Sequence, residues 1–170
     1  FRLFHGVESD ILPDGSLDYP AEVLATFDYV VGSVHSSFGM SREEMTGRVV
    51  RAVRDPYLTM LGHPTGRLLL SRKGYDLDVG QVIDAAAERG VVIGINANPH
   101  RLDLDWRHVR VAAARGILIA TNRDVHSAGG LEHVTYGVDM ARKAGLTPEQ
   151  IVNCWPLDRV EGYLAERKQA

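Results

Sequence analysis

The sequence predicts an α/β fold in which strand–helix units repeat and build one parallel sheet. Short apolar runs recur at a nearly constant interval, and the stretch after each is long enough to hold a helix. An acidic or imidazole residue lies in each run or just after it, at Glu8, His35, His63 and Asp124. The interval between His63 and Asp124 is about twice as long as the earlier ones, and its midpoint lies in the apolar run that precedes Asn98. Such a repeat builds a parallel sheet, which becomes a barrel when it closes.

The strands are expected where the short apolar runs occur. Each run is too short for a typical helix and apolar enough to be buried in a parallel sheet. These runs occupy residues 3–11, 28–34, 58–61, 91–96 and 117–121. Pro13-Asp14-Gly15-Ser16 is a turn signal directly after the first run.

The stretches between the runs carry helix signals. Ser41 and Glu44 match a capping box, and apolar residues follow them at helical spacing. Asp78 begins the next helix, and Gly90 is suited to its C-terminal end. Thr147 begins a further capping signal with proline at the first helical position. Other helices are expected at about 21–27, 105–115 and 131–144, and a last amphipathic one around Leu157, Val160, Tyr163 and Leu164.

Composition sets limits on the class of protein. The chain has 170 residues, of which 45% are hydrophobic and 24% charged, which fits one globular domain with a core. The net charge of −3 argues against nucleic-acid binding through a broad basic face, but not against an enzyme that holds one strand end through metals and a few arginines. No apolar stretch approaches the ~20 residues that cross a bilayer, so we expect no membrane partner.

The single cysteine also carries information. Cys154 has no partner for an internal disulfide, which favours a reducing compartment and a cytoplasmic location. We expect Cys154 to be a small buried residue on a helix.

The residues at the strand ends predict a metal site. The carboxyl ends of parallel strands gather on one face of a barrel, where such folds carry their chemistry. Imidazole and carboxylate together suit Mn²⁺, Zn²⁺ or Fe²⁺. Asp124 and His126 alternate, so both point to one face of an extended segment. A single histidine after an apolar run is also typical of a hydrogen-bonded core residue, and Asp124 also suits a turn or helix cap.

Several segments together resemble one known family. These are GVESDILPDGSLD, VVGSVHSSF, LGHPTGRLLL, GINANPHRLDL, DVHS and the closing NCWPLDRV. They are similar to the PHP (polymerase and histidinol phosphatase) domain, in the version found at the C-terminal end of bacterial family X DNA polymerases. The similarity covers almost the whole chain.

The resemblance implies a distorted seven-stranded (β/α) barrel of the TIM-like kind that holds up to three divalent metal ions, Mn or Zn. It implies phosphoester hydrolysis, and in these repair polymerases a 3′→5′ exonuclease or 3′-end-processing activity on DNA. Metal-activated hydroxide would attack phosphorus, so no catalytic side chain is expected beyond the metal-bound water. The family's metal ligands correspond to Glu8, His35, His63, Asp124 and His126.

Two further residues are candidates for contacting the substrate. Arg67 follows His63 closely, and a guanidinium binds phosphate through two hydrogen bonds. A surface salt bridge explains Arg67 equally well. Asn98 would orient substrate or ligands, or would only satisfy the backbone of its loop.

The chain departs from the family pattern in ways that bear on activity. The opening His-x-His motif is absent and would precede Phe1, so we expect residues 1–170 to be the C-terminal portion of one PHP barrel, without its upstream strands and polymerase domains. Gly94 stands where the family usually has Glu, Arg123 where it has a small residue or Thr, and Val125 where it has Ala. We therefore expect weak or no catalysis from this portion alone.

Two alternatives to a DNA-processing phosphoesterase remain. One is a small-molecule phosphatase of the histidinol-phosphatase type, which would use the same ligands. The other is a degenerate barrel without catalytic activity that serves as a scaffold for the polymerase.

Overall fold

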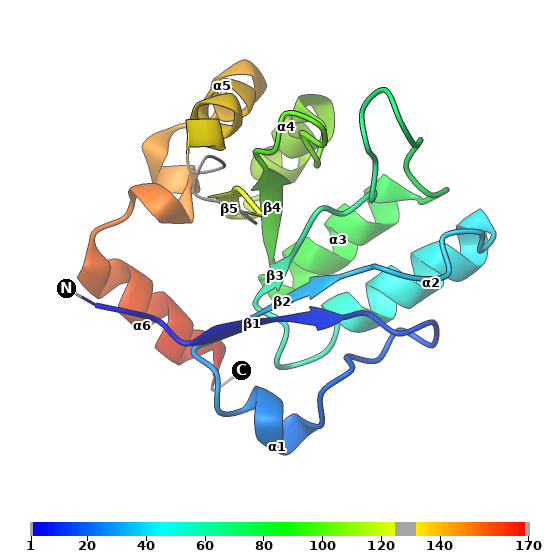
Figure 1. Ribbon diagram of the computed structural model, residues 1–170. Coiled ribbons are helices and arrows are strands. Elements are labelled where there is room, and N and C mark those ends of the chain that lie inside the picture. The colour runs from blue at the N-terminus through cyan, green and yellow to red at the C-terminus, as the bar shows by residue number, and fades with distance from the viewer. Residues whose placement is uncertain (1, 125–131, 169–170) are drawn as a thin grey trace.

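A five-stranded parallel sheet forms the centre of the protein, so the expected α/β class is confirmed (Figure 1). The computed structural model describes residues 2–124 and 132–168. The strands lie in chain order, β1-β2-β3-β4-β5, as successive strand–helix units require. Their bounds are Gly6–Asp10 (β1), Tyr29–Ser33 (β2), Met60–Leu61 (β3), Val92–Asn96 (β4) and Ile119–Asn122 (β5).

Four helices follow one another along one side of this sheet, and a fifth lies opposite them (Figure 1). The four are α2 (Arg42–Val53), α3 (Val79–Arg89), α4 (Trp106–Ala114) and α5 (Val134–Ala144). Helix α6 (Leu157–Arg167) lies on the other side, preceded by the short 3-10 helices η2 (Pro148–Gln150) and η3 (Val152–Cys154). Helix α1 (Ala21–Leu24) is a single turn between β1 and β2 and is shorter than expected.

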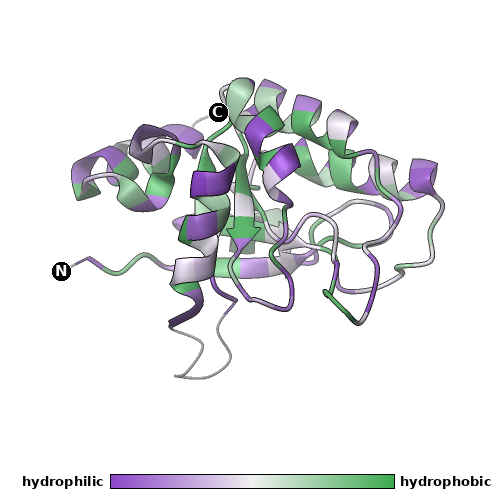
Figure 2. Cartoon of the chain, turned by 90° about the horizontal axis from the view of Figure 1, so that it is seen from above, coloured by the Kyte–Doolittle hydropathy of each residue, from purple (hydrophilic) through white to green (hydrophobic). Residues whose placement is uncertain are grey.

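The core lies between the sheet and helices α2 to α5. Apolar residues of the strands and of the inward helix faces meet there, while the outer helix faces are hydrophilic (Figure 2). The largest fully buried side chains include Ile11, Met45, Leu58, Leu61, Ile83, Ile93, Ile95, Leu104 and Ile119. Removing this apolar surface from water is the main favourable term in folding.

The helix ends confirm the local signals where these act within one turn. The Ser41 hydroxyl accepts a hydrogen bond from the Glu44 amide at 3.3 Å, and the Glu44 carboxylate accepts one from the Ser41 amide at 2.9 Å. Asp78 caps α3, and Gly90 ends that helix with a φ of 62°, a left-handed conformation that glycine adopts without steric cost.

The C-terminal region departs from expectation in two places. Thr147 forms its capping box, but only the 3-10 helix η2 follows, because Ile151 returns the chain to an extended conformation. The expectation for Cys154 is wrong: the residue is exposed and ends the 3-10 helix η3. A 3-10 turn does not present the continuous apolar stripe that would bury it.

Within residues 2–124 and 132–168, no helix combines the length and the apolarity that crossing a membrane requires.

One buried cation connects the segments that follow β1 and β2. Arg48 on α2 is only 3% exposed. Its guanidinium donates to the carbonyl oxygens of Ile11 and Leu12 after β1, the latter at 2.9 Å. It also donates to the Ser36 carbonyl after β2 at 3.0 Å. Arg48 therefore fixes the relative position of these two segments.

Replacing Arg48 with methionine should lower the free energy of unfolding by about 3 kcal/mol. The substitution keeps most of the apolar stem but leaves buried carbonyl groups without donors, which costs about 1–3 kcal/mol for each group. Arg51→Met is the matched control, because Arg51 is an exposed residue of the same helix, and it should change stability by less than about 0.5 kcal/mol. Urea unfolding followed by circular dichroism measures both. Equal effects would contradict the role given to Arg48.

Candidate metal centre

Glu8, His35 and His63 come together from three neighbouring strands. Glu8 is the central residue of β1, while His35 and His63 each lie two residues beyond the ends of β2 and β3. Because β1, β2 and β3 are parallel neighbours, their following segments lie at the same edge of the sheet. The recurring position of these residues in the sequence therefore corresponds to proximity in space.

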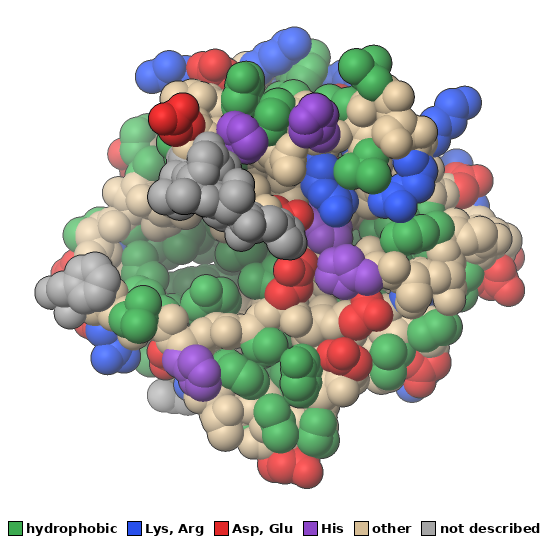
Figure 3. Space-filling model, in the orientation of Figure 1, with side chains coloured by type: hydrophobic (Ala, Val, Ile, Leu, Met, Phe, Trp, Pro, Cys, Tyr) green, Lys and Arg blue, Asp and Glu red, His purple; other side chains and the backbone are tan. Residues whose placement is uncertain are grey.

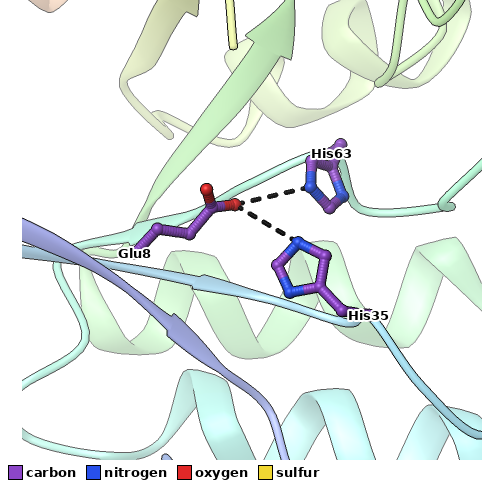
Figure 4. Close-up of side chains that lie close together, drawn as sticks. All are labelled: Glu8, His35 and His63. Carbon is purple, nitrogen blue, oxygen red and sulfur yellow. Dashed lines mark ion pairs between the residues drawn. The ribbon is translucent and has the colours of Figure 1, made fainter. Parts of the chain in front are cut away.

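Their donor atoms are spaced as ligands of one metal ion would be (Figure 4). Glu8 Oε1 lies 3.4 Å from His63 Nε2 and 3.7 Å from His35 Nε2. One donor atom from each of the three residues lies within 4.8 Å of the others. Ligands about 2.1 Å from a tetrahedral ion are about 3.4 Å apart. The donor set therefore fits a transition-metal ion.

The imidazoles of His63 and His35 stabilise the negative charge of Glu8. The His63 imidazole, with smaller effects of the Ser33 hydroxyl and His35, lowers the pKa of Glu8 to about 2 against the opposing effect of burial. The carboxylate is therefore ionised at neutral pH. His63 is 5% exposed, and its Nδ1 has no hydrogen-bond partner within the part of the chain that the structure describes.

Asp124 borders the same site. A hollow of about 120 Å³ is lined by Glu8, Val31, Gly62, His63, Gly94, Asn96, Asn122 and Asp124. Asp124 lies two residues beyond β5, and its Oδ2 accepts a hydrogen bond from the Asn96 amide at 3.2 Å. Its carboxylate also lies 3.6 Å from Arg101 Nε. His126, the remaining candidate ligand, lies outside the described residues.

Gly94 lies in the wall of this hollow at a point where there is little room for a side chain. A Cβ atom added there would lie 3.2 Å from both the Asn122 side-chain nitrogen and the Leu61 carbonyl oxygen. Both contacts are tight, so even alanine would require a small displacement. The departure from the family pattern at Gly94 thus falls in the wall of the candidate site.

The two candidate substrate-binding residues are engaged elsewhere. The Arg67 guanidinium donates to the carbonyl oxygens of Arg101 and Leu102 and to the carboxylate of Asp105 at 3.2 Å. Asn98 Oδ1 accepts a hydrogen bond from the His100 amide at 2.9 Å. Both arrangements match the structural alternatives that the sequence left open, and neither residue lines the hollow.

Two charged residues beside the site were not singled out as site residues by the sequence. Asp10 lies 3.4 Å from His35 Nδ1, and Arg101 pairs with Asp124. Asp10 was detectable in principle, because it lies two residues after Glu8 and strand residues at that spacing share a face. Arg101 carries no such local signal, because its pairing depends on where the loop after β4 lies.

Figure 3 shows this face of the molecule. Histidine and acidic side chains gather at its centre, and Lys or Arg side chains lie directly beside them. Negative and positive side chains therefore lie next to each other on this face.

Comparison with known proteins gives two kinds of relative. The chain is 39% identical over 164 residues to the DNA polymerase/3'-5' exonuclease PolX of Bacillus subtilis, an alignment that covers 96% of the chain and 29% of the polymerase. It is 27% identical over 178 residues to a probable phosphatase of Thermoanaerobacter, covering 99% of the chain and 70% of the phosphatase. The chain is 24% identical to a probable phosphatase of Caldanaerobacter subterraneus, in an alignment that covers 67% of the phosphatase.

No family model matches the chain. The chain spans less than a third of the length of the polymerase, so the alignment relates it to one part of that protein. Over almost its whole length it is homologous to that part, and its resemblance to the bacterial family X DNA polymerases, which the sequence motifs indicate, is confirmed.

Proposed function

We propose that the chain is the metal-binding part of a phosphoesterase that hydrolyses DNA phosphodiester bonds at 3′ ends. The observation that carries this proposal is the convergence of Glu8, His35 and His63 at one edge of the sheet, with donor spacing that suits a metal ion. Asp124 and His126 are proposed as further ligands, which allows more than one ion. Mn²⁺ and Zn²⁺ both suit this mixture of imidazole and carboxylate.

Each residue of the centre has a separate task. Glu8 supplies a negative charge that persists at neutral pH, since its pKa is about 2. His35 and His63 supply neutral nitrogen donors that fix the position of the ion relative to the sheet. When bound, such ions polarise the phosphoryl group and lower the pKa of water to about 7. We further propose that Arg101, which pairs with Asp124, attracts a phosphate toward the hollow.

DNA is proposed as the substrate because the relative that combines 39% identity with almost complete coverage of the chain is named a DNA polymerase/3'-5' exonuclease. We further propose that the sheet belongs to a seven-stranded barrel, with the remaining strands and the polymerase domains supplied by upstream polypeptide. Arg67 and Asn98 remain candidates for substrate contacts only if their present hydrogen bonds rearrange.

A small-molecule phosphatase is the second candidate. It is favoured by the probable phosphatases of which the chain spans about two thirds. The same metal centre would serve both activities, and only the residues around it would differ.

His63→Ala should abolish metal binding and any hydrolysis while leaving the fold intact. The substitution removes one of three closely spaced donors, and we expect at least a 100-fold loss of Zn²⁺ affinity by isothermal titration calorimetry. His108→Ala is the control, because His108 is exposed on α4 and away from the hollow. Unchanged metal affinity in His63→Ala would contradict the assignment.

Metal affinity should fall as the pH falls from about 7.5 to 5. Imidazole ligands must lose a proton before they bind metal, whereas Glu8 remains ionised throughout this range because its pKa is about 2. Glu8→Gln should therefore weaken binding at every pH but leave the slope unchanged. Calorimetry at several pH values tests this, and binding that does not depend on pH would argue against histidine ligands.

A substrate panel should show hydrolysis of 3′-ended DNA in preference to phosphorylated metabolites. The assay is run with protein in excess over substrate, because the expected activity of this portion is weak. Preference for histidinol phosphate would support the phosphatase instead. If the chain binds no metal and hydrolyses neither class, the non-catalytic scaffold would be favoured.

A further inference from the structure

We propose that Asp10 is a positioning residue that holds His35 in the ring orientation and tautomer required of a metal ligand. The inference rests on the proposed metal centre and names a residue outside its ligand set. The observation behind it is that one carboxylate oxygen contacts both the backbone and the ring of His35.

The contacts are direct. Asp10 Oδ1 accepts a hydrogen bond from the His35 backbone amide at 3.1 Å. The same oxygen lies 3.4 Å from Nδ1 of the His35 ring. A single carboxylate oxygen therefore restrains His35 at two points, one on the main chain and one on the side chain.

The two ring nitrogens of His35 face different carboxylates. Nε2 points to Glu8 Oε1 at 3.7 Å, and Figure 4 shows the other nitrogen directed away from Glu8. That other nitrogen, Nδ1, meets Asp10. A neutral imidazole carries its proton on one nitrogen only. A proton on Nδ1, attracted by Asp10, leaves the lone pair of Nε2 free for a metal ion.

The strand geometry explains why two carboxylates flank one ring. Glu8 and Asp10 alternate along β1 and so share a face, roughly 7 Å apart along the strand. His35 follows the neighbouring strand β2 and lies between them. Asp10 does not belong to the close group of donor atoms formed by Glu8, His35 and His63. Asp10 instead contacts the His35 ring at the nitrogen that does not face Glu8.

Asp10 is itself held in a fixed position. Its backbone carbonyl oxygen accepts a hydrogen bond from the Asp18 amide at 3.1 Å. Its backbone amide donates to the Asp18 carboxylate at 3.2 Å, and the buried Ser9 hydroxyl donates to that carboxylate at 2.8 Å. Because the main chain at Asp10 is restrained in this way, its carboxylate constrains His35 instead of following it.

His63 provides an internal comparison. Its Nε2 also faces Glu8, but among residues 2–124 and 132–168 no group forms a hydrogen bond with its Nδ1. Only 4% of the His63 side chain is exposed, so burial holds it in place, whereas 46% of the His35 side chain is exposed. Loss of Asp10 should therefore affect His35 and spare His63.

The first test measures the tautomer of His35 without metal. Long-range ¹H–¹⁵N correlation spectra of the metal-free chain, recorded at a pH high enough for the imidazole to be neutral, should show His35 with its proton on Nδ1. In Asp10→Ala the acceptor oxygen beside Nδ1 is removed, so the proton should move toward Nε2. Asp76→Ala, at an exposed aspartate in the loop before α3, is the control and should leave His35 unchanged. An unchanged His35 tautomer in Asp10→Ala would overturn the proposal.

The second test measures Zn²⁺ affinity by calorimetry. Asp10→Asn and Asp10→Ala should each weaken binding about 10- to 100-fold, while Asp76→Asn should match the wild-type chain. Equal affinity in the two Asp10 variants and the wild type would overturn the proposal but leave the metal centre intact. A wild-type chain that binds no Zn²⁺ would instead count against the proposed function. The tautomer measurement on the metal-free chain would still decide the role of Asp10. Amide spectra confirm that each variant is folded, and the alanine variant covers the case in which asparagine disturbs β1.

Discussion

An ionised carboxylate held between two imidazoles is the interaction on which the rest of the site depends. Glu8 projects from the middle of β1, and a partly buried carboxylate is costly unless other groups stabilise its charge. His63 is the largest source of that stabilisation, and His35 adds to it. In the absence of metal the His63 imidazole thus stabilises the Glu8 carboxylate, and with metal the same atoms become ligands. The site can therefore form with the fold, before any ion binds.

The scaffold around this group is organised to keep it in place. Parallel strands in chain order bring the segments after β1, β2 and β3 to one edge. Arg48 then connects the segments after β1 and β2 through three carbonyl groups, and Asp10 connects β1 to His35. Both contacts act between the two segments that supply Glu8 and His35. A metal centre needs ligands fixed within a fraction of an ångström, and buried polar contacts of this kind provide that precision.

The sequence predicts well those features that depend on neighbouring residues. The capping box at Ser41 and the helix end at Gly90 act within one turn, and both are present. The positions of His35 and His63 near strand ends follow from a regular repeat in the sequence. This repeat can be recognised even when the predicted bounds of a strand are wrong by one or two residues. Contacts between distant segments are different. The engagement of Arg67 by the loop after β4, and the exposure of Cys154, depend on packing that no local pattern records.

The measurement that tests the account most directly is a crystal structure of the chain grown with Zn²⁺, with anomalous scattering data that locate the metal. The account predicts an anomalous peak about 2.1 Å from Glu8 Oε1, His35 Nε2 and His63 Nε2, with Asp10 still contacting His35 Nδ1. Absence of a peak at this place, or a peak elsewhere with these three side chains turned apart, would contradict it.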